Sequence, residues 1–127
     1  MQLNSLTAIS PIDGRYGSKT SDLRPVFSEF GLIKNRVIVE IRWLQSLAAH
    51  PGIPEVPAFS NETQDQLERI ITEFGEGDAE RVKAIERTTN NDVKAVEYLM
   101  KEKIDGNDEI EKVREFVNLV CNCEDMK

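Results

Sequence analysis

Residues 86–97 of this chain read ERTTNNDVKAVE, a polar break that runs directly into the start of an amphipathic helix. Thr, Asn and Asp side chains compete for nearby backbone groups, so they favour turns and helix caps over helix interiors. Asp92 is then well placed to cap a helix that continues from Val93. The unpaired N–H groups and partial positive charge of a helix start suit an anionic ligand. From these residues alone, a well-capped turn between two helices is the simpler interpretation.

Apolar residues recur at helical spacing on both sides of this break. Their spacing from Val26 to Ala48 predicts a helix over 26–49, with Pro25 in its first turn and Glu40 off the apolar stripe. Shorter stripes predict helices over 62–74, 78–87, 92–104 and 108–121. The core positions expected from these stripes are Phe30, Val37, Ile41, Leu44, Leu67, Ile71, Val96 and Phe116.

Turn and cap signals separate the predicted helices. Three prolines stiffen residues 51–60, Asn61 with Gln64 fits a capping box, and Asp78 can cap the third helix. No alternating run of β-branched residues and no repeat occurs in the sequence. The pattern therefore predicts an all-α fold, with residues 1–127 forming a single helical domain.

A second polar motif, SPIDGRY at residues 10–16, combines turn signals with a cation and a ring hydroxyl. Asp13-Gly14 favours a tight turn, which places Arg15 and Tyr16 on a constrained loop. An arginine can hold a phosphate or carboxylate with two parallel hydrogen bonds. On spacing alone, a surface arginine beside a half-buried tyrosine is the preferred interpretation.

The formal net charge of −7 opposes non-specific binding to nucleic acid or to an anionic membrane, and neither partner is expected. No signal-like start and no run of 18 apolar residues occurs, so a cytoplasmic location is expected. The cysteines, Cys121 and Cys123, and the single histidine, His50, are too few and too scattered for a metal site. Reduced thiols and an exposed His50 are expected instead.

Three blocks together resemble the amino-terminal domain of bacterial adenylosuccinate lyases, members of the fumarase/aspartase superfamily. The blocks are residues 10–16, the RWL of residues 42–44 with the EVPAF of 55–59, and residues 86–98. The resemblance implies a helical domain beside a central helical bundle that forms a homotetramer with shared active sites. It also implies a purine nucleotide substrate, fumarate elimination from adenylosuccinate and from succinyl-aminoimidazole-carboxamide ribotide, and no metal or organic cofactor.

By position, the residues implied to contact substrate are Arg15, Tyr16, Asn90, Asn91, Asp92, Asn122 and Cys123. The family has histidine where this chain has Asn91, and a Thr-Ser pair where it has Asn122 and Cys123. A further family histidine is replaced by Asn118. Because an amide cannot exchange protons near neutral pH, Asn91 can hydrogen-bond but cannot act as an acid or base.

Two functions remain open from the sequence. In the first, the chain is the amino-terminal part of an adenylosuccinate lyase and is inactive alone, because the family's catalytic histidine and serine lie beyond the region matched. No residue of the chain is therefore assigned as catalytic. In the second, the chain is a non-catalytic helical module that binds or regulates a partner. An exposed apolar face would favour the first function, whereas polar residues on that face would favour the second.

Overall fold

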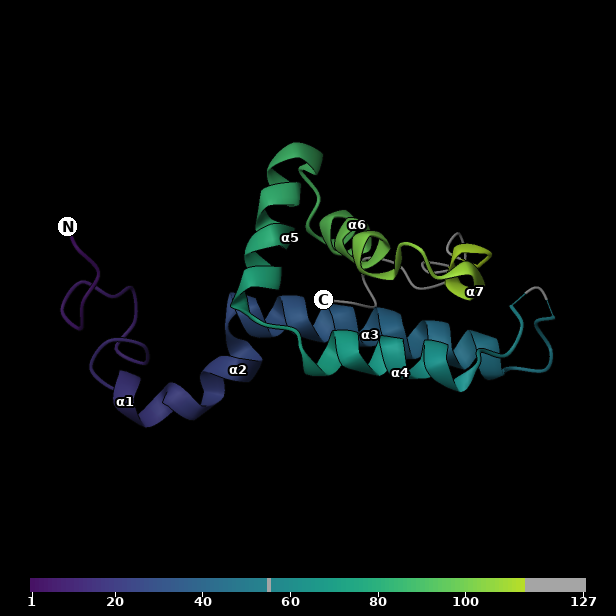
Figure 1. Cartoon of the computed structure of the whole chain (residues 1–127). Helices are drawn as coiled ribbons and strands as arrows, with labels where there is room; N and C mark the ends of the chain where they lie inside the picture. The colour runs from purple at the N-terminus through teal and green to yellow at the C-terminus, as the bar shows by residue number, and fades with distance from the viewer. Residues whose placement is uncertain (55, 114–127) are drawn as a thin grey trace. The chain divides into compact units, whose positions relative to one another are not determined.

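The computed structural model describes residues 1–54 and 56–113, and their regular structure is helical throughout (Figure 1). The all-α prediction is confirmed. The chain divides into two compact units, Met1–Leu32 and Ile33–Lys127. Within the described ranges, every helix is too short or too polar to span a bilayer. The assignment of residues 1–127 to a single domain stays a prediction.

The first unit consists of turns and short helices. Helix α1 covers Gly17–Thr20, the 3-10 helix η1 covers Ser21–Leu23, and α2 covers Arg24–Phe27. Helix α3, Glu29–Ala49, begins in this unit. The predicted helix over 26–49 is therefore wrong at its start, although Pro25 does occupy the first turn of a helix, that of α2.

Ser28 causes the break between α2 and α3. Its backbone is extended, with ψ of 170°. The Ser28 Oγ accepts a hydrogen bond from the Gly31 N–H at 3.1 Å, as an N-cap serine does. A Cβ on Gly31 would lie 2.4 Å from the Val26 carbonyl oxygen, so the close approach at this corner requires glycine. Val26 and Phe27 are exposed as a result and do not extend the stripe of α3.

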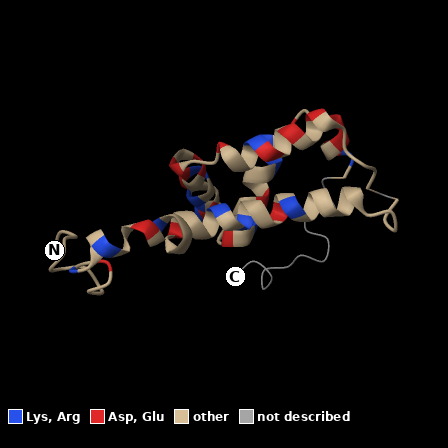
Figure 2. Cartoon of the chain, turned by 90° about the horizontal axis from the view of Figure 1, so that it is seen from below, with Lys and Arg blue, Asp and Glu red and all other residues tan. Residues whose placement is uncertain are grey.

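The second unit contains most of α3, followed by α4 over Asn61–Thr72, α5 over Glu76–Thr89, α6 over Asp92–Ile104 and α7 over Asp108–Glu111. Helices α3 and α4 run antiparallel, because Arg42 bonds Glu68 while Gln45 Nε2 donates to Gln64 at 2.9 Å (Figure 1). Helices α5 and α6 are joined by the Arg81–Glu102 ion pair at 2.6 Å. Acidic and basic residues are interspersed along the helices (Figure 2).

A polar cluster, formed by Ser60, Thr63, Asn107 and Glu109, joins the start of α4 to the start of α7. The Glu109 carboxylate accepts hydrogen bonds from Ser60 Oγ at 2.7 Å and from Thr63 Oγ1. Asn107 Nδ2 donates to Thr63 Oγ1 at 3.2 Å, while its Oδ1 caps α7 by accepting from the Ile110 N–H. These contacts fix α7 against α4 although α7 is a single turn long.

The predicted core is mostly confirmed. Val37, Ile41, Leu44, Leu67 and Val96 are fully buried, whereas Phe30 and Ile71 are only half-buried. Phe116 lies outside the described residues, as does most of the predicted helix over 108–121.

Two predicted caps are displaced along the chain. Ser60, not Asn61, caps α4 by accepting from the Thr63 N–H. Asp78 lies inside α5, and its carboxylate accepts from the Gly75 N–H at 3.0 Å. In both places a polar side chain of the expected kind accepts a hydrogen bond from a backbone N–H at the helix start. Capping is therefore predicted correctly, but the position of the cap residue is not.

Candidate functional site

In the first unit, hydrogen bonds within residues 10–20 hold the Arg15-Tyr16 loop. The Tyr16 N–H donates to the Pro11 carbonyl at 2.8 Å, and Thr20 Oγ1 donates to the Ile12 carbonyl at 3.0 Å. The Arg15 guanidinium lies 5.8 Å from the centroid of the Tyr16 ring, and both side chains are exposed. The predicted constrained loop is confirmed, and it offers an arginine and a phenol together to solvent.

In the second unit, the 90–92 turn joins α5 to α6. Asn90 ends α5 with φ of 53° and ψ of 27°, the left-handed conformation that asparagine tolerates better than most residues. Its N–H donates to the Glu86 carbonyl at 2.8 Å. Thr89 Oγ1 accepts from the Asn91 N–H at 3.3 Å, which ties the turn to the end of α5.

Asn91 is the N-cap of α6, so the prediction that Asp92 caps this helix is wrong by one residue. The Asn91 Oδ1 accepts from the Lys94 N–H at 2.8 Å, and the Asn91 backbone is extended. Asparagine and aspartate are comparable N-caps, so the sequence alone could not decide between the two neighbours.

Asp92 makes a long-range contact that the sequence analysis missed. Its Oδ2 lies 2.9 Å from the Arg36 guanidinium of α3, and its Oδ1 accepts from the Val93 N–H at 2.9 Å. Burial opposes ionisation of Asp92, but the Arg36 charge and the Val93 N–H outweigh it and hold the pKa of this carboxyl below its usual value. Asp92 is therefore charged at neutral pH.

Like Arg36, Glu40 is a buried polar residue of α3. Its side chain is fully buried, and within the described part of the chain neither carboxylate oxygen has a hydrogen-bond partner. Burial, followed by the negative charge of Glu97, raises the pKa of Glu40 from 4.5 to about 8, although Lys101 and Lys94 act in the opposite direction. Glu97 itself pairs with both lysines at 2.9 Å.

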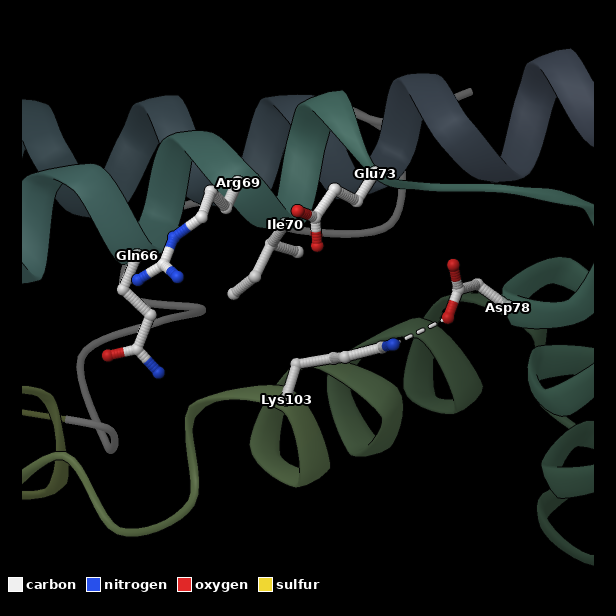
Figure 3. Close-up of a pocket in the computed structure, with 6 residues that line it drawn as sticks. All are labelled: Gln66, Arg69, Ile70, Glu73, Asp78 and Lys103. Carbon is white, nitrogen blue, oxygen red and sulfur yellow. Dashed lines mark ion pairs between the residues drawn. The ribbon is translucent and has the colours of Figure 1, made fainter.

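Two concavities of the second unit bear on ligand binding. One, of about 400 Å³, lies beside the 90–92 turn and is lined by Lys83, Glu86, Arg87 and Asn90. The other, of about 290 Å³, is lined by residues of α4, α5 and α6 and holds the Lys103–Asp78 ion pair at 2.6 Å (Figure 3). None of the predicted site residues lines the second concavity. The first combines two cations with a predicted contact residue, which suits an anionic group better.

The predicted site residues fall in separate parts of the chain. Arg15 and Tyr16 belong to the first unit, and the 90–92 turn belongs to the second. Asn118, Asn122 and Cys123 lie outside the described residues. Among the described residues, no group of three His, Cys, Asp or Glu side chains could hold a metal ion. His50 is exposed, as expected.

The all-helical fold fits the helical amino-terminal domain of a fumarase/aspartase-like lyase. No protein-family model matches the chain. It is, however, 60% identical over 126 residues to the adenylosuccinate lyase of Vibrio cholerae and 57% identical to that of Escherichia coli. The Haemophilus influenzae adenylosuccinate lyase is 56% identical over the same length.

Each match covers 99% of this chain and 28% of the relative. The chain is thus homologous to the amino-terminal part of adenylosuccinate lyase, and the resemblance stated from the three sequence blocks is confirmed.

Proposed function

We propose that the chain supplies the substrate-binding amino-terminal part of an adenylosuccinate lyase. The observation that carries this proposal is the 60% identity to a relative of that name over 99% of the chain. The substrate class is a purine nucleotide bearing a succinyl group, and the reaction is elimination of fumarate, which leaves AMP when adenylosuccinate is the substrate. Cytoplasmic location and assembly into a homotetramer belong to the same proposal.

The proposed roles of the described residues follow from their geometry. Arg15 supplies a cation and Tyr16 a hydroxyl for the anionic groups of the nucleotide. The 90–92 turn lies at the positive dipole end of α6 and, through Asn90, lines the same concavity as the Lys83 and Arg87 side chains. We propose that the Arg15-Tyr16 loop, the 90–92 turn, Asn122 and Cys123 each contact the substrate.

Elimination requires a base that removes the proton next to a carboxylate and an acid that protonates the leaving nitrogen. No residue of this chain is proposed for either role, since Asn91 is an amide. We propose that both groups come from the part of the enzyme that this chain does not match.

An apolar surface of the first unit favours this function over an independent regulatory module. The exposed large apolar side chains of residues 1–32 are Met1, Leu3, Leu6, Ile9, Ile12, Tyr16, Leu23, Val26 and Phe27. Side chains of this kind are usually covered in a protein that functions alone. They are the feature expected if the remainder of a larger enzyme packs against this unit.

The first test follows adenylosuccinate loss with the purified chain alone. We expect no fumarate, because general acid and general base assistance each contribute about 10² to 10⁴ in rate and neither group is assigned here. Turnover by the chain alone would contradict the proposal. Binding to a full-length lyase without turnover would instead support the regulatory-module alternative.

The second test is a hybrid enzyme, in which this chain replaces the matched 28% of the Vibrio cholerae lyase. The hybrid should assemble and form fumarate more slowly than the parent, and Asn91→His should raise its rate by restoring the family's residue. If the assembled hybrid stays inactive after the family's residues are restored at Asn91, Asn122 and Cys123, the proposed substrate-binding role is wrong.

A further inference from the structure

The start of α6 is held from a distance by a buried cation. Arg36 projects from α3 with only 4% of its side chain exposed, and its guanidinium lies 2.9 Å from Asp92 Oδ2. A buried guanidinium requires a compensating charge, since leaving it unpaired is strongly unfavourable. The Arg36–Asp92 pair therefore fixes α3 relative to the first residue of α6.

The same pair fixes the orientation of the Asp92 carboxylate. Its Oδ2 faces Arg36, while its Oδ1 accepts from the Val93 N–H in the first turn of α6. The carboxylate is held from two sides by the protein itself. It also carries a negative charge, which makes it a poor direct contact for the phosphate or carboxylate groups of a nucleotide.

Among the described residues, the remaining hydrogen bonds of the 90–92 turn are local. Asn91 Oδ1 accepts from the Lys94 N–H, and Thr89 Oγ1 accepts from the Asn91 N–H. Local hydrogen bonds shape the turn but do not attach it to another helix. The Arg36–Asp92 pair attaches it to the longest helix of the chain, whose neighbouring positions Ile33 and Val37 are buried.

We propose that Arg36 is a positioning residue that holds the 90–92 turn through Asp92, and that Asp92 serves this attachment and does not contact the ligand. The proposal deepens the proposed function and rests on it for the identity of the ligand. It assigns the ligand contacts of the turn to the side chains of Asn90 and Asn91, because the N–H groups of the turn already donate to protein acceptors.

The first measurement is amide hydrogen exchange in the full 127-residue chain, which needs no ligand. Arg36→Met should lower the protection of the Val93 and Lys94 amides by about tenfold, because the turn loses its attachment to α3. The matched control, Arg81→Met, removes an ion pair to the other end of α6 and should leave both amides unchanged. Equal protection in the two variants would overturn the proposal.

A conservative variant keeps the proposal testable if Arg36→Met does not fold. Arg36→Lys keeps the charge but loses the planar fork, so it should restore part of the protection lost in Arg36→Met. Circular dichroism reports whether each variant keeps its helices. If Arg36→Met does not fold, intermediate protection in Arg36→Lys still supports the proposal, and unchanged protection contradicts it.

The second measurement is AMP affinity, followed by NMR titration of the same chain. Arg36→Met should weaken AMP binding several-fold. Val82→Ala, which creates a cavity at a buried position of α5, should lower thermal stability without this loss. Adding Asp92→Asn to Arg36→Met should cause no further loss, because Asp92 acts through Arg36. A further loss would overturn the role assigned to Asp92. If AMP does not bind the unaltered chain, hydrogen exchange decides the role of Arg36, and the hybrid enzyme decides the proposed function.

Discussion

At the scale of single residues, the buried Glu40 makes the stability of this protein depend on pH. A carboxyl group whose pKa rises on folding holds its proton more tightly in the folded state than in the unfolded state. Its pKa is about 8 when folded, against 4.5 ordinarily. Its contribution is therefore fully present below pH 4.5, is lost progressively as the pH rises through this interval, and is absent above pH 8.

Glu40→Gln should remove this dependence, because glutamine has nearly the same shape and no charge. At pH 7 the variant should be more stable than the unaltered chain by on the order of 3 kcal/mol, and the gain should vanish near pH 4.5. Chemical denaturation at a series of pH values measures the difference. Glu62→Gln, at an exposed position of α4, is the control and should show no such trend. A gain for Glu40→Gln that is the same at every pH would contradict this account.

The sequence predicted the apolar residues of α3 better than its polar ones. The apolar spacing predicts burial of Val37, Ile41 and Leu44, and these residues are buried. The series Ile33, Arg36, Glu40, Leu44 has helical spacing as well, and it is also buried. Helical periodicity is therefore compatible with burial of Arg36 and Glu40. Their charges nevertheless predict exposure, because the sequence does not show that α6 packs against them.

At the scale of elements, alanine substitutions at two helical glycines test whether the α2–α3 corner requires glycine. Gly31 lies at this corner, and Gly77 is the control. Gly31→Ala should destabilise the protein by about 1–3 kcal/mol, because the new Cβ would meet the Val26 carbonyl oxygen at 2.4 Å. Gly77→Ala, in the first turn of α5, meets nothing within 4 Å and should stabilise by about 0.5–1 kcal/mol. Thermal unfolding of the two variants, measured side by side, checks the opposite signs. Two changes of the same sign would refute the described corner.

The polar cluster between α4 and α7 gives a second element-scale prediction. Thr63→Val keeps the shape of this buried side chain but removes its hydrogen bonds to Glu109 and Asn107, which should cost about 1 kcal/mol or more. Thr72→Val changes an exposed threonine at the end of the same helix and should cost less. Urea denaturation compares the two. An equal loss in both variants would show that the cluster does not fasten α7 to α4.

Most helices were predictable because their apolar spacing and caps agree. The predicted ranges for α4, α5 and α6 lie within two residues of the observed ends. The corner at Ser28 was not predicted, because apolar residues continue at helical spacing through Val26 and Phe27. The Ser28 cap and the clash that reserves position 31 for glycine together distinguish a corner from a continuous helix there, and the clash exists only in three dimensions.

At the scale of the whole molecule, the apolar surface of the first unit predicts association. Phe27 is 80% exposed, and neighbouring Val26 and Leu23 are also exposed. We expect the purified chain to associate as its concentration rises, and Phe27→Ser to reduce that association. Sedimentation equilibrium measures both, with Val39→Ser, at a less exposed apolar position of α3, as the control. Identical association of the two variants would contradict a role for this surface.

The local structure of the two candidate turns was predictable from the sequence, whereas the substrate contacts of their residues stay a prediction. The two turns that carry Arg15 and Asn90 are formed as their polar residues indicate. Their proximity stays a prediction, because no local pattern encodes the distance between segments that lie in different units.

The cap made by Asn91 has a consequence for how this chain has evolved. Asparagine is among the best N-cap residues, and histidine is not, so the histidine that the resemblance implies at this position would weaken the start of α6 by about 1 kcal/mol relative to asparagine. Selection for catalysis and selection for a stable fold therefore act in opposite directions on one side chain. Asn91→His should lower the melting temperature of the chain while it raises turnover in the hybrid enzyme. A lineage released from the need for turnover would drift toward the residue found here.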